Sequence, residues 1–328
     1  MKELEPKQVP LVGVIIPLYN KGKYIARAID SVLRQTYQNF EIIVVNDGST
    51  DNGPDIVSNY HDSRIHIIHQ INSGPGAARN RGITESKAPF LSFLDADDEW
   101  LPEFLEKSIE HLQKHPECLL SVSGHFRGEE RTSWQEHLPH FLTTEGVWRL
   151  PTDMKPQLVK SAIDFFHSGA VLCSRQIVEQ FGGFYSKDRC TYGEDSYLWI
   201  QVALNYQIYL DPTPLMWHHT EASELGQGRK GVRPPWPKLT DPKPIRDNCP
   251  PEYLSLLEHC LAYYALLAAY RHVYFGDTQT VKALLESFPM SETFYPNYIK
   301  LKIRLSFISF FNRFWKLRHW LNQTKIAS

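Results

Sequence analysis

The sequence of 328 residues predicts an α/β fold in which a mostly parallel sheet is flanked by helices. Apolar runs typical of buried strands alternate with segments of helical spacing through the first hundred residues, and this alternation implies right-handed crossovers between parallel strands. Polar residues follow three of these runs directly. Because ligands bind beyond the carboxyl ends of the strands in such sheets, these residues predict a binding site.

The early elements are predicted from apolar runs and from helical spacing. The predicted strands are 11–17, 40–45, 64–69 and 90–94. The spacing of Ile25, Ile29 and Val32 is typical of a helix. The run Asn46-Asp47-Gly48-Ser49 is a strong turn signal and ends the second strand. The predicted helices between the strands are 24–33, 55–60 and 76–86.

The later sequence is less regular. A helix over 104–115 ends at Pro116, and 124–156 is an irregular polar stretch of the length that commonly forms a lid or a binding loop. The Pro-rich stretch 226–251 is interpreted as an extended linker or strap. The other predicted elements, a short strand and four helices, are 171–173, 175–181, 252–274, 278–287 and 298–321.

Composition and charge exclude several classes of protein. The hydrophobic content of 42% and charged content of 22% are those of a folded protein, and the net charge of −2 argues against wholesale nucleic-acid binding. Five cysteines without a CxxC pair favour a reducing compartment over a disulfide framework or a zinc knuckle. Residues 1–8 lack the apolar core of a signal peptide, and no apolar run reaches the roughly 18 residues of a spanning helix. We therefore expect a cytoplasmic protein.

Three carboxylates follow the fourth predicted strand, at Asp95, Asp97 and Asp98. They repel one another, so folding alone would not select them. A divalent cation bound by hard oxygen ligands offsets that repulsion and can also hold a substrate phosphate. Alternatively, Asp97 and Asp98 cap the helix that begins near Pro102, because Asp favours helix N-termini.

The ends of three predicted strands bring Tyr19 and Asn20, Asp47 and these carboxylates to one rim of the sheet. The glycine-rich run 74–79 does not fit a dinucleotide site, because it lacks the last glycine of the G-x-G-x-x-G pattern and follows the third strand. The sequence contains no P-loop motif. The rim is therefore a candidate site of another kind.

Six motifs occur in order along the chain. They are Pro17-Leu18-Tyr19-Asn20, Val45-Asn46-Asp47-Gly48-Ser49-Thr50-Asp51, Gly76-Ala77-Ala78-Arg79-Asn80-Arg81-Gly82, Leu94-Asp95-Ala96-Asp97-Asp98, Gly182-Gly183-Phe184 and Gly193-Glu194-Asp195-Ser196-Tyr197-Leu198-Trp199. Together they resemble the inverting family-2 glycosyltransferases of the GT-A fold, over roughly residues 9–223, whereas the last hundred residues carry no family motif.

The resemblance implies an open, mixed but mostly parallel sheet flanked by helices, with a C-terminal helical extension. It also implies a division of the chain into four parts. These are a nucleotide-sugar-binding half, an acceptor-binding and catalytic half, a Pro-rich linker and a helical C-terminal region, at 1–103, 104–225, 226–251 and 252–328.

A nucleotide site on the rim is the next implication of the resemblance. Asp47 would accept a hydrogen bond from a uracil-type base, and Tyr19 would pack on that base. Asp95 would contact the ribose side, and Arg79 would lie near the nucleotide. By their own chemistry, Asp47 could be only a turn former, Arg79 a surface ion-pair partner and Tyr19 ordinary packing. The nucleotide-binding set implied by the resemblance is Pro17, Tyr19, Asn20, Asp47, Arg79, Asp95 and Ala96.

A divalent metal site is also implied by the resemblance. Asp97 would hold Mn²⁺ or Mg²⁺ on the diphosphate, and Asp98 is a less certain partner. Members of the family often carry a His or Arg near the metal, in the region where this chain has His218 and His219. Of the two, His219 is the preferred metal ligand, and either could instead be a solvated or core histidine.

Asp195, with Glu194 beside it, resembles the catalytic base of the family. Both carboxylates could instead cap a helix that begins at Ser196. As a base, one carboxylate suffices, because a divalent ion stabilises the leaving diphosphate and no carboxylic acid has to protonate it. A glycosidase would need two working carboxyls. The expected outcome is inversion at the anomeric carbon.

The implied partners are a nucleotide-sugar donor, preferably a UDP-sugar, and a glycan or lipid-linked saccharide acceptor. The alternatives are a sugar-phosphate nucleotidyltransferase, for which 19–23 is a poor phosphate-binding loop, and a catalytically silent glycan-binding protein. Residues 298–321 carry apolar and basic stripes at helical spacing, which favours an anionic membrane surface at the inner face of the cytoplasmic membrane. Docking of this helix on the protein's own core or on a partner protein is the alternative.

Overall fold

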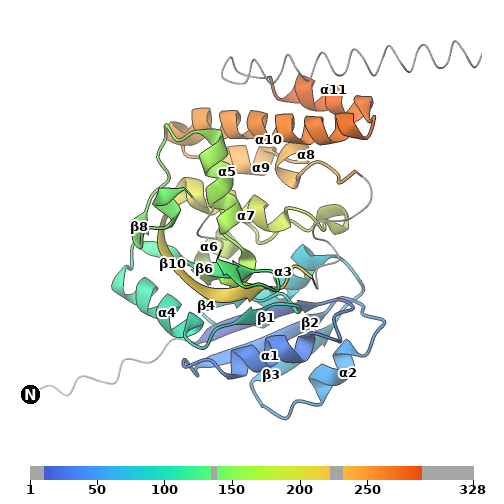
Figure 1. The fold of residues 1–328 in the computed structure, drawn as a ribbon, viewed down its shortest axis with the longest axis vertical. Helices are drawn as coiled ribbons and strands as arrows, with labels where there is room; N and C mark the ends of the chain where they lie inside the picture. The colour runs from blue at the N-terminus through green and yellow to red at the C-terminus, as the bar shows by residue number, and fades with distance from the viewer. Residues whose placement is uncertain (1–10, 134–138, 222–231, 290–328) are drawn as a thin grey trace, which may run out of the picture.

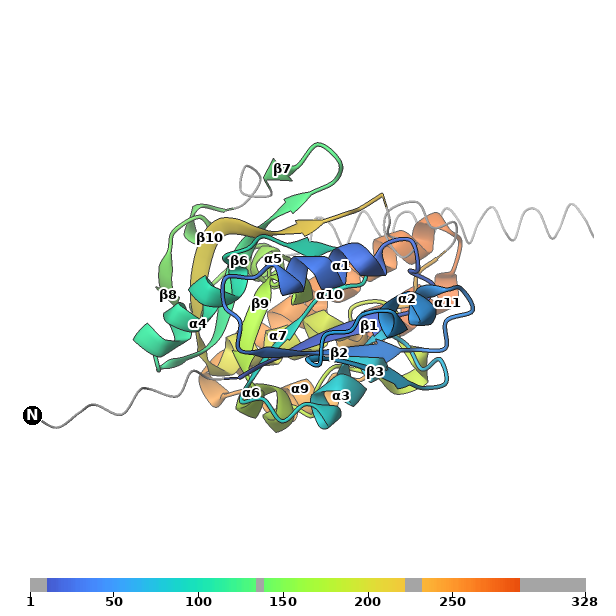
Figure 2. The same cartoon turned by 90° about the horizontal axis from the view of Figure 1, so that it is seen from below.

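The computed structural model describes residues 11–133, 139–221 and 232–289 (Figure 1). In its first part, strands and helices alternate as predicted. Helices α1 and α2 cover one face of these strands and α3 covers the other (Figure 2). These elements are β1 (Val12–Leu18), α1 (Ile25–Leu33), β2 (Phe40–Asn46), α2 (Gly53–Ser58), β3 (Ile65–His69), α3 (Pro75–Glu85) and β4 (Phe90–Phe93).

The second part adds strands of both directions and four helices among the described residues. They are β5 (Glu99–Trp100), α4 (Phe104–Lys114), β6 (Cys118–Arg127), β7 (Thr132–Ser133), β8 (Gly146–Trp148), α5 (Pro156–Phe165), β9 (Val171–Ser174), α6 (Arg175–Gln180), α7 (Glu194–Asn205) and β10 (Gln207–His218). Three 3₁₀ turns lie between them, η2 (His140–Leu142), η3 (Ser168–Ala170) and η4 (Lys187–Arg189). The stretch 124–156 is therefore more regular than expected, because β6 runs into it and β7 and β8 lie within it.

One mixed sheet joins the strands in the order β3-β2-β1-β4-β9-β6-β10-β5, with β7 paired to β6 and β8 to β10. The pairs β1–β2, β1–β4, β2–β3 and β6–β10 are parallel, whereas β9 runs antiparallel to β4 and β6. This open sheet confirms the predicted fold class. Its topology also brings the ends of β1, β2, β4 and β10 to the same edge.

Side chains alternate between two cores along β1. Val12, Val14 and Ile16 face a cluster that includes the apolar side of α1, whereas Ile15 faces the cluster on the other side of the sheet. This alternation is what period-two geometry requires of a strand buried on both faces. The sheet is thereby held rigidly below the edge at which its strands end.

The Pro-rich stretch differs from the extended conformation expected of it. Within its described part it forms α8 (Pro237–Thr240), α9 (Lys243–Asp247) and a 3₁₀ turn, η5 (Pro251–Tyr253). Proline is well suited to the first turn of a helix, where its missing N–H has no intrahelical acceptor. Leu239 and Ile245 pack into the main core cluster, so this part of the chain is a packed element of the fold.

Two further helices follow close to the predicted positions, α10 (Leu254–Tyr274) and α11 (Thr278–Ser287). Leu257 and Leu261 of α10 share one core cluster with Trp199 of α7. None of the helices in the described ranges is long and apolar enough to cross a membrane. The predicted helix 298–321 lies outside the described residues, and the fourfold division of the chain stays a prediction.

Candidate active site

Asp47 fixes the loop that leads into α3. The side chain is buried, and its Oδ1 accepts hydrogen bonds from the Gln70 side chain and the Ser73 N–H, both at 2.8 Å. Its Oδ2 accepts a third from the Gly74 N–H at 2.9 Å. Asp47 is thus more than a local turn former, because it ties the end of β2 to the loop after β3. Recognition of a base by this residue stays a prediction.

The residues that follow β1 lie against the turn after β2. Asn20 has a left-handed backbone with φ of 51°, and its Oδ1 accepts a hydrogen bond from the Thr50 N–H at 2.8 Å. The Asn20 N–H donates to Ser49 Oγ at 3.1 Å. Tyr19 beside it is 47% exposed, so its ring lies open at the edge, as a base-stacking residue requires. Pro17 lies within β1.

Arg79 of α3 joins the two parts of the site. Its guanidinium is buried and donates hydrogen bonds to Asp95 Oδ1 at 2.7 Å and to Glu194 Oε1 at 2.8 Å. It also lies 5.1 Å from the ring centroid of Phe184. The alternative of a surface ion pair is therefore wrong. Although burial opposes ionisation of Asp95, the positive charge of Arg79 holds its pKa below the usual value.

The two other acidic residues of this region begin α7. The helix starts at Glu194, two residues before the expected Ser196, and Gly193 precedes it in a left-handed conformation with φ of 78°. Glu194 is buried, and Asp195 accepts a hydrogen bond from the Ser196 N–H at 2.6 Å. Both carboxylates therefore lie in the first turn, where the helix dipole stabilises negative charge.

The pKa values of these two carboxyl groups are both raised above their usual values. Burial and the neighbouring Asp195 raise the pKa of Glu194 to about 7, against the effect of Arg79. The pKa of Asp195 is also raised by its enclosed position, and Arg79, the Ser196 N–H and Lys238 oppose that rise. A carboxylate with a raised pKa accepts a proton more readily, as general-base chemistry requires.

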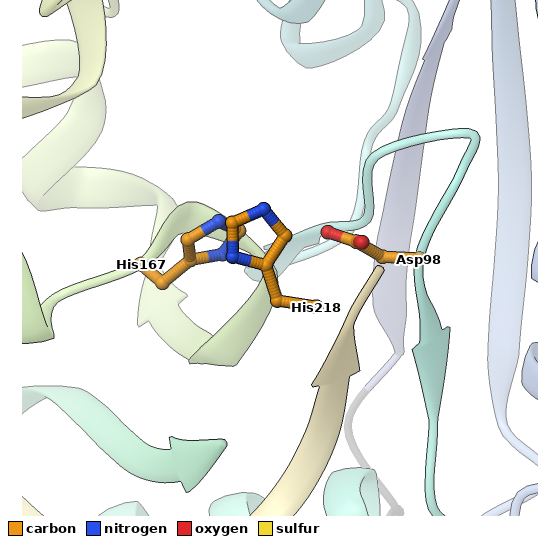
Figure 3. Close-up of side chains that lie close together, drawn as sticks. All are labelled: Asp98, His167 and His218. Carbon is orange, nitrogen blue, oxygen red and sulfur yellow. The ribbon is translucent and has the colours of Figure 1, made fainter. Parts of the chain in front are cut away.

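A second cluster brings together Asp98, His167 and His218 (Figure 3). One ligand atom from each side chain lies within 4.8 Å of the others, and the two imidazole rings are 4.7 Å apart. Asp98 Oδ1 accepts a hydrogen bond from the His219 N–H at 2.9 Å, which orients the carboxylate. Asp98 follows β4, His167 precedes η3 and His218 ends β10, so the fold alone assembles the cluster.

The protonation states of the cluster suit a divalent cation. Burial lowers the pKa of His167 well below its usual value and lowers that of His218 as well. The imidazoles are therefore neutral, which is the form that ligates a metal. Burial and the nearby Asp97 and Asp95 raise the pKa of Asp98 well above its usual value. A bound cation would reverse that rise, and the donor set of one carboxylate and two imidazoles fits such an ion.

The predicted ligands Asp97 and His219 have other partners among the described residues. Asp97 forms an ion pair with Lys21 at 2.9 Å, and its carbonyl accepts a hydrogen bond from Arg27. His219 bonds to Glu221 through Nδ1 at 2.8 Å and stacks on Trp217. The geometry thus favours His218 over His219, and Asp98 over Asp97. The metal assignment of Asp97 stays a prediction.

Two features of the site carry no signal in the sequence. His167 follows the apolar pair Phe165-Phe166 and belongs to none of the six motifs, so only the fold reveals its position. Lys238 lies in the Pro-rich stretch, yet it reaches the first turn of α7. Ala96, in contrast, was predicted near the nucleotide, and its side chain is buried in the apolar cluster beside α1.

A sequence model described as "Glycosyl transferase family 2" matches residues 13–182, more than half of the chain. The chain belongs to glycosyltransferase family 2. This is the family that the six motifs resemble. The matched range contains Asp47, Arg79 and the carboxylates after β4, and it ends before α7.

Curated relatives are similar over parts of their length. An uncharacterized glycosyltransferase of Rickettsia typhi is 34% identical over 205 residues, which is 62% of this chain and 61% of that protein. The putative teichuronic acid biosynthesis glycosyltransferase TuaG of Bacillus subtilis is 40% identical over 119 residues, 35% of this chain and 47% of TuaG. Across these and similar relatives, the match covers between 18% and 61% of the relative's own length.

Solved structures resemble a larger part of the fold. TarS residues 1–349 from S. aureus, in complex with UDP, has a TM-score of 0.59 at 20% identity, over 90% of this chain and 79% of that one. A mannosyltransferase from Pyrobaculum calidifontis, in complex with GDP-Man and Mn²⁺, has a TM-score of 0.55 at 18% identity, over 92% and 81% of the two chains. At these identities the likeness shows the shared fold.

Proposed function

We propose that this glycosyltransferase moves a sugar from a nucleoside-diphosphate sugar, preferably a UDP-sugar, to a hydroxyl group with inversion at the anomeric carbon. The observation that carries the proposal is the position of Arg79. Its buried guanidinium bonds to Asp95, at the end of β4, and to Glu194, at the start of α7. This bridge brings Asp195 beside the edge at which the predicted nucleotide-binding residues lie.

Asp195 acts as the base in this proposal. It removes the proton of the acceptor hydroxyl while that oxygen attacks C1 from the face opposite the diphosphate. The bond between C1 and the diphosphate oxygen breaks in the same displacement, and the diphosphate leaves with the electron pair. General-base assistance of this kind contributes roughly 10²–10⁴-fold. Glu194 accepts a hydrogen bond from Arg79, so it helps to hold the guanidinium between the start of α7 and Asp95.

Asp98, His167 and His218 would hold Mn²⁺ or Mg²⁺. When bound there, the ion would stabilise the negative charge of the leaving diphosphate as a Lewis acid. Neutral imidazoles, an oriented carboxylate and the close approach of their ligand atoms support this assignment. Lys21 and Arg27 contribute positive charge to the same edge, through their contacts with Asp97.

The donor proposal draws on the known proteins as well as on the site. Two of the TarS structures contain UDP or UDP-GlcNAc, and the mannosyltransferase structure contains GDP-Man. All three are nucleoside diphosphates or their sugars, and that is the class of ligand that we propose for this edge. A UDP-sugar is preferred because Asp47 resembles the residue that reads a uracil-type base.

The proposed acceptor is a glycan or a lipid-linked saccharide, with the enzyme at the cytoplasmic face of a membrane. The support is the basic and aromatic sequence of 298–321, which lies outside the described residues. Deleting residues 298–328 should weaken binding to anionic liposomes. Unchanged binding would contradict the membrane proposal, whereas the proposed transfer reaction would not depend on this result.

The transfer reaction is tested with Asp195→Asn. A thermal-shift screen of nucleotide sugars, with Mn²⁺ and with EDTA, first identifies the donor through its stabilisation of the folded chain. The variant should then lose roughly 10²–10⁴-fold in transfer and keep its affinity for the donor in calorimetry. The matched control is Asp188→Asn, which changes an exposed carboxylate in η4. Turnover of Asp195→Asn equal to that of the control would remove Asp195 from the role of base.

A further inference from the structure

The part of the Pro-rich stretch that contains α8, residues 232–247, lies on the first turn of α7, and we call it the strap. The Tyr197 hydroxyl donates a hydrogen bond to the Asp241 carbonyl at 2.9 Å, and the Asp241 carboxylate pairs with Lys187 at 2.5 Å. A Cβ atom added to Gly193 would lie 2.5 Å from the Trp236 ring. Glycine is therefore required at this position, because the strap leaves no room for a side chain there.

The strap inserts a charged side chain beneath the helix. Lys238 of α8 has an exposed fraction of 0%, although lysine is rarely buried. Its Nζ donates a hydrogen bond to Ser196 Oγ at 2.8 Å and lies 4.1 Å from the ring centroid of Tyr264. Burial of an ammonium group is unfavourable unless the surroundings stabilise the charge. The hydrogen bond and the aromatic ring both provide such stabilisation.

Ser196 connects Lys238 to the proposed base. Its hydroxyl accepts the bond from Lys238 and donates to the Gly193 carbonyl at 3.1 Å, which fixes the side chain. Its backbone N–H donates to Asp195 Oδ1 at 2.6 Å. A buried cation, a fixed hydroxyl and the carboxylate therefore form one connected group at the start of α7.

Charges on several elements act on this group. Lys238 faces Asp195 of α7 and Asp164 of α5, which favour its charge, and Lys160, which opposes it. Burial lowers the pKa of Lys238 to about 8, so the ammonium is protonated at neutral pH. The remaining groups that face these side chains are Arg79 of α3, Asp95 after β4, Cys260 and Tyr264 of α10, and Glu194 of α7.

On the basis of the proposed role of Asp195 as the base, we propose that Lys238 is a positioning residue. It holds the first turn of α7 through Ser196 and keeps the Asp195 carboxylate charged in an enclosed site. Arg79 of α3 and Lys238 of α8 both act to lower the pKa of Asp195, so cations on two different elements stabilise the charged carboxylate. Arg79 is already bonded to two other carboxylates. Lys238 is therefore the cation that is connected to the base through Ser196, in the first turn of α7.

The direct test is an NMR titration of carbon-labelled aspartate in the full chain, with the Asp195 signal assigned from Asp195→Asn. In Lys238→Met, the pKa of Asp195 should move to a higher value than in the unchanged chain, because an opposite charge is lost. Lys238→Gln restores a hydrogen-bond donor for Ser196 without the charge and should show the same shift. The control Lys187→Met removes an exposed lysine of η4 that pairs with Asp241 of the strap, and it should leave the pKa of Asp195 unchanged.

A Lys238 variant that titrates like the unchanged chain would overturn the proposal, and if Lys238→Met does not fold, Lys238→Gln decides. The titration needs no transfer reaction, so its failure is distinct from a failure of the proposed function. Where transfer is measured, Lys238→Met should lose roughly tenfold at the acidic end of the kcat/KM profile and little at the alkaline end, with an unchanged KM for the donor. A role in packing alone would lower transfer by the same factor at every pH.

Discussion

Two acidic clusters lie in the site, and they resolve the repulsion between carboxylates in different ways. At the start of α7, Glu194 bonds to Arg79, and Asp195 is flanked by Arg79 and Lys238, so the chain supplies the positive charge. After β4, Asp98 instead faces His167 and His218. Because these imidazoles are neutral, only the second cluster lacks a permanent cation at its ligand atoms within the described residues.

This difference in neighbouring charge indicates which of the two clusters needs an external ion. The pair in α7 is balanced by side chains, which suits a base that must stay in place and exchange only a proton. The Asp98 cluster has the donor atoms of a metal site and a carboxyl whose pKa is raised well above its usual value by burial and by Asp97 and Asp95. The same residue type thus has two roles that are set by surroundings.

The strongest way to break this comparison is to remove the cation that joins Glu194 of the first cluster to Asp95, which lies next to the second in the sequence. Arg79→Met would leave the buried Glu194 and the half-buried Asp95 without this partner, and loss of one member of a buried pair costs about 3–5 kcal/mol of unfolding free energy. The matched control is Arg81→Met in the same helix, whose ion pair with Glu85 is exposed, with an expected loss below about 1 kcal/mol. Urea unfolding measures both. Equal losses would contradict the central position of Arg79.

A pH titration of stability sharpens the difference at Glu194. Its pKa rises from 4.5 to about 7 on folding, so the native state holds more protons than the unfolded chain between these values. The unfolding free energy therefore falls as pH rises through this window, by up to about 3 kcal/mol. Glu194→Gln should remove that fall, whereas Glu179→Gln at an exposed ion pair should keep it. A parallel pH dependence in Glu194→Gln and the unchanged chain would refute the raised value.

Metal binding gives the smallest expected effect and tests the other cluster. Asp98→Asn and His167→Gln should each raise the Mn²⁺ concentration needed for half-maximal stabilisation about tenfold or more, which is the usual effect of disturbing a metal site. His219→Gln should change it little, because its side chain bonds to Glu221. Asp97→Asn decides between two assignments. A larger loss in Asp97→Asn than in Asp98→Asn would favour the ligand that the sequence predicted.

The edge of the sheet could be predicted because its residues directly follow apolar strands. Asn20, Asp47 and Asp95 each lie within two residues of a strand end, and parallel strands bring such positions together whatever the details of packing. The apolar runs themselves sufficed for β1, β2 and β4, since strands buried on both faces are continuously apolar.

Contacts made across long stretches of chain could not be predicted in the same way. His167 meets His218 only because η3 and the end of β10 lie together in the folded sheet. Lys238 lies in a stretch whose prolines suggested an extended conformation, but Pro237 begins a short helix instead. Neither residue shows a periodic pattern, because each reaches the site from a short turn or helix, and composition says nothing of where such a turn is packed.

The shared core of the molecule has a consequence for its folding. One cluster includes Ile15 of β1, Trp199 of α7, Leu257 of α10 and Phe288 directly after α11. Contacts so distant in sequence close slowly, because the entropy of a long loop is lost before they form. The α10 helix packs on α5 and α11, so during synthesis α5 keeps an apolar side exposed until the last described helices emerge from the ribosome. The α10 helix thus acts as a late closing element, and a chain that stops before it would be prone to aggregation.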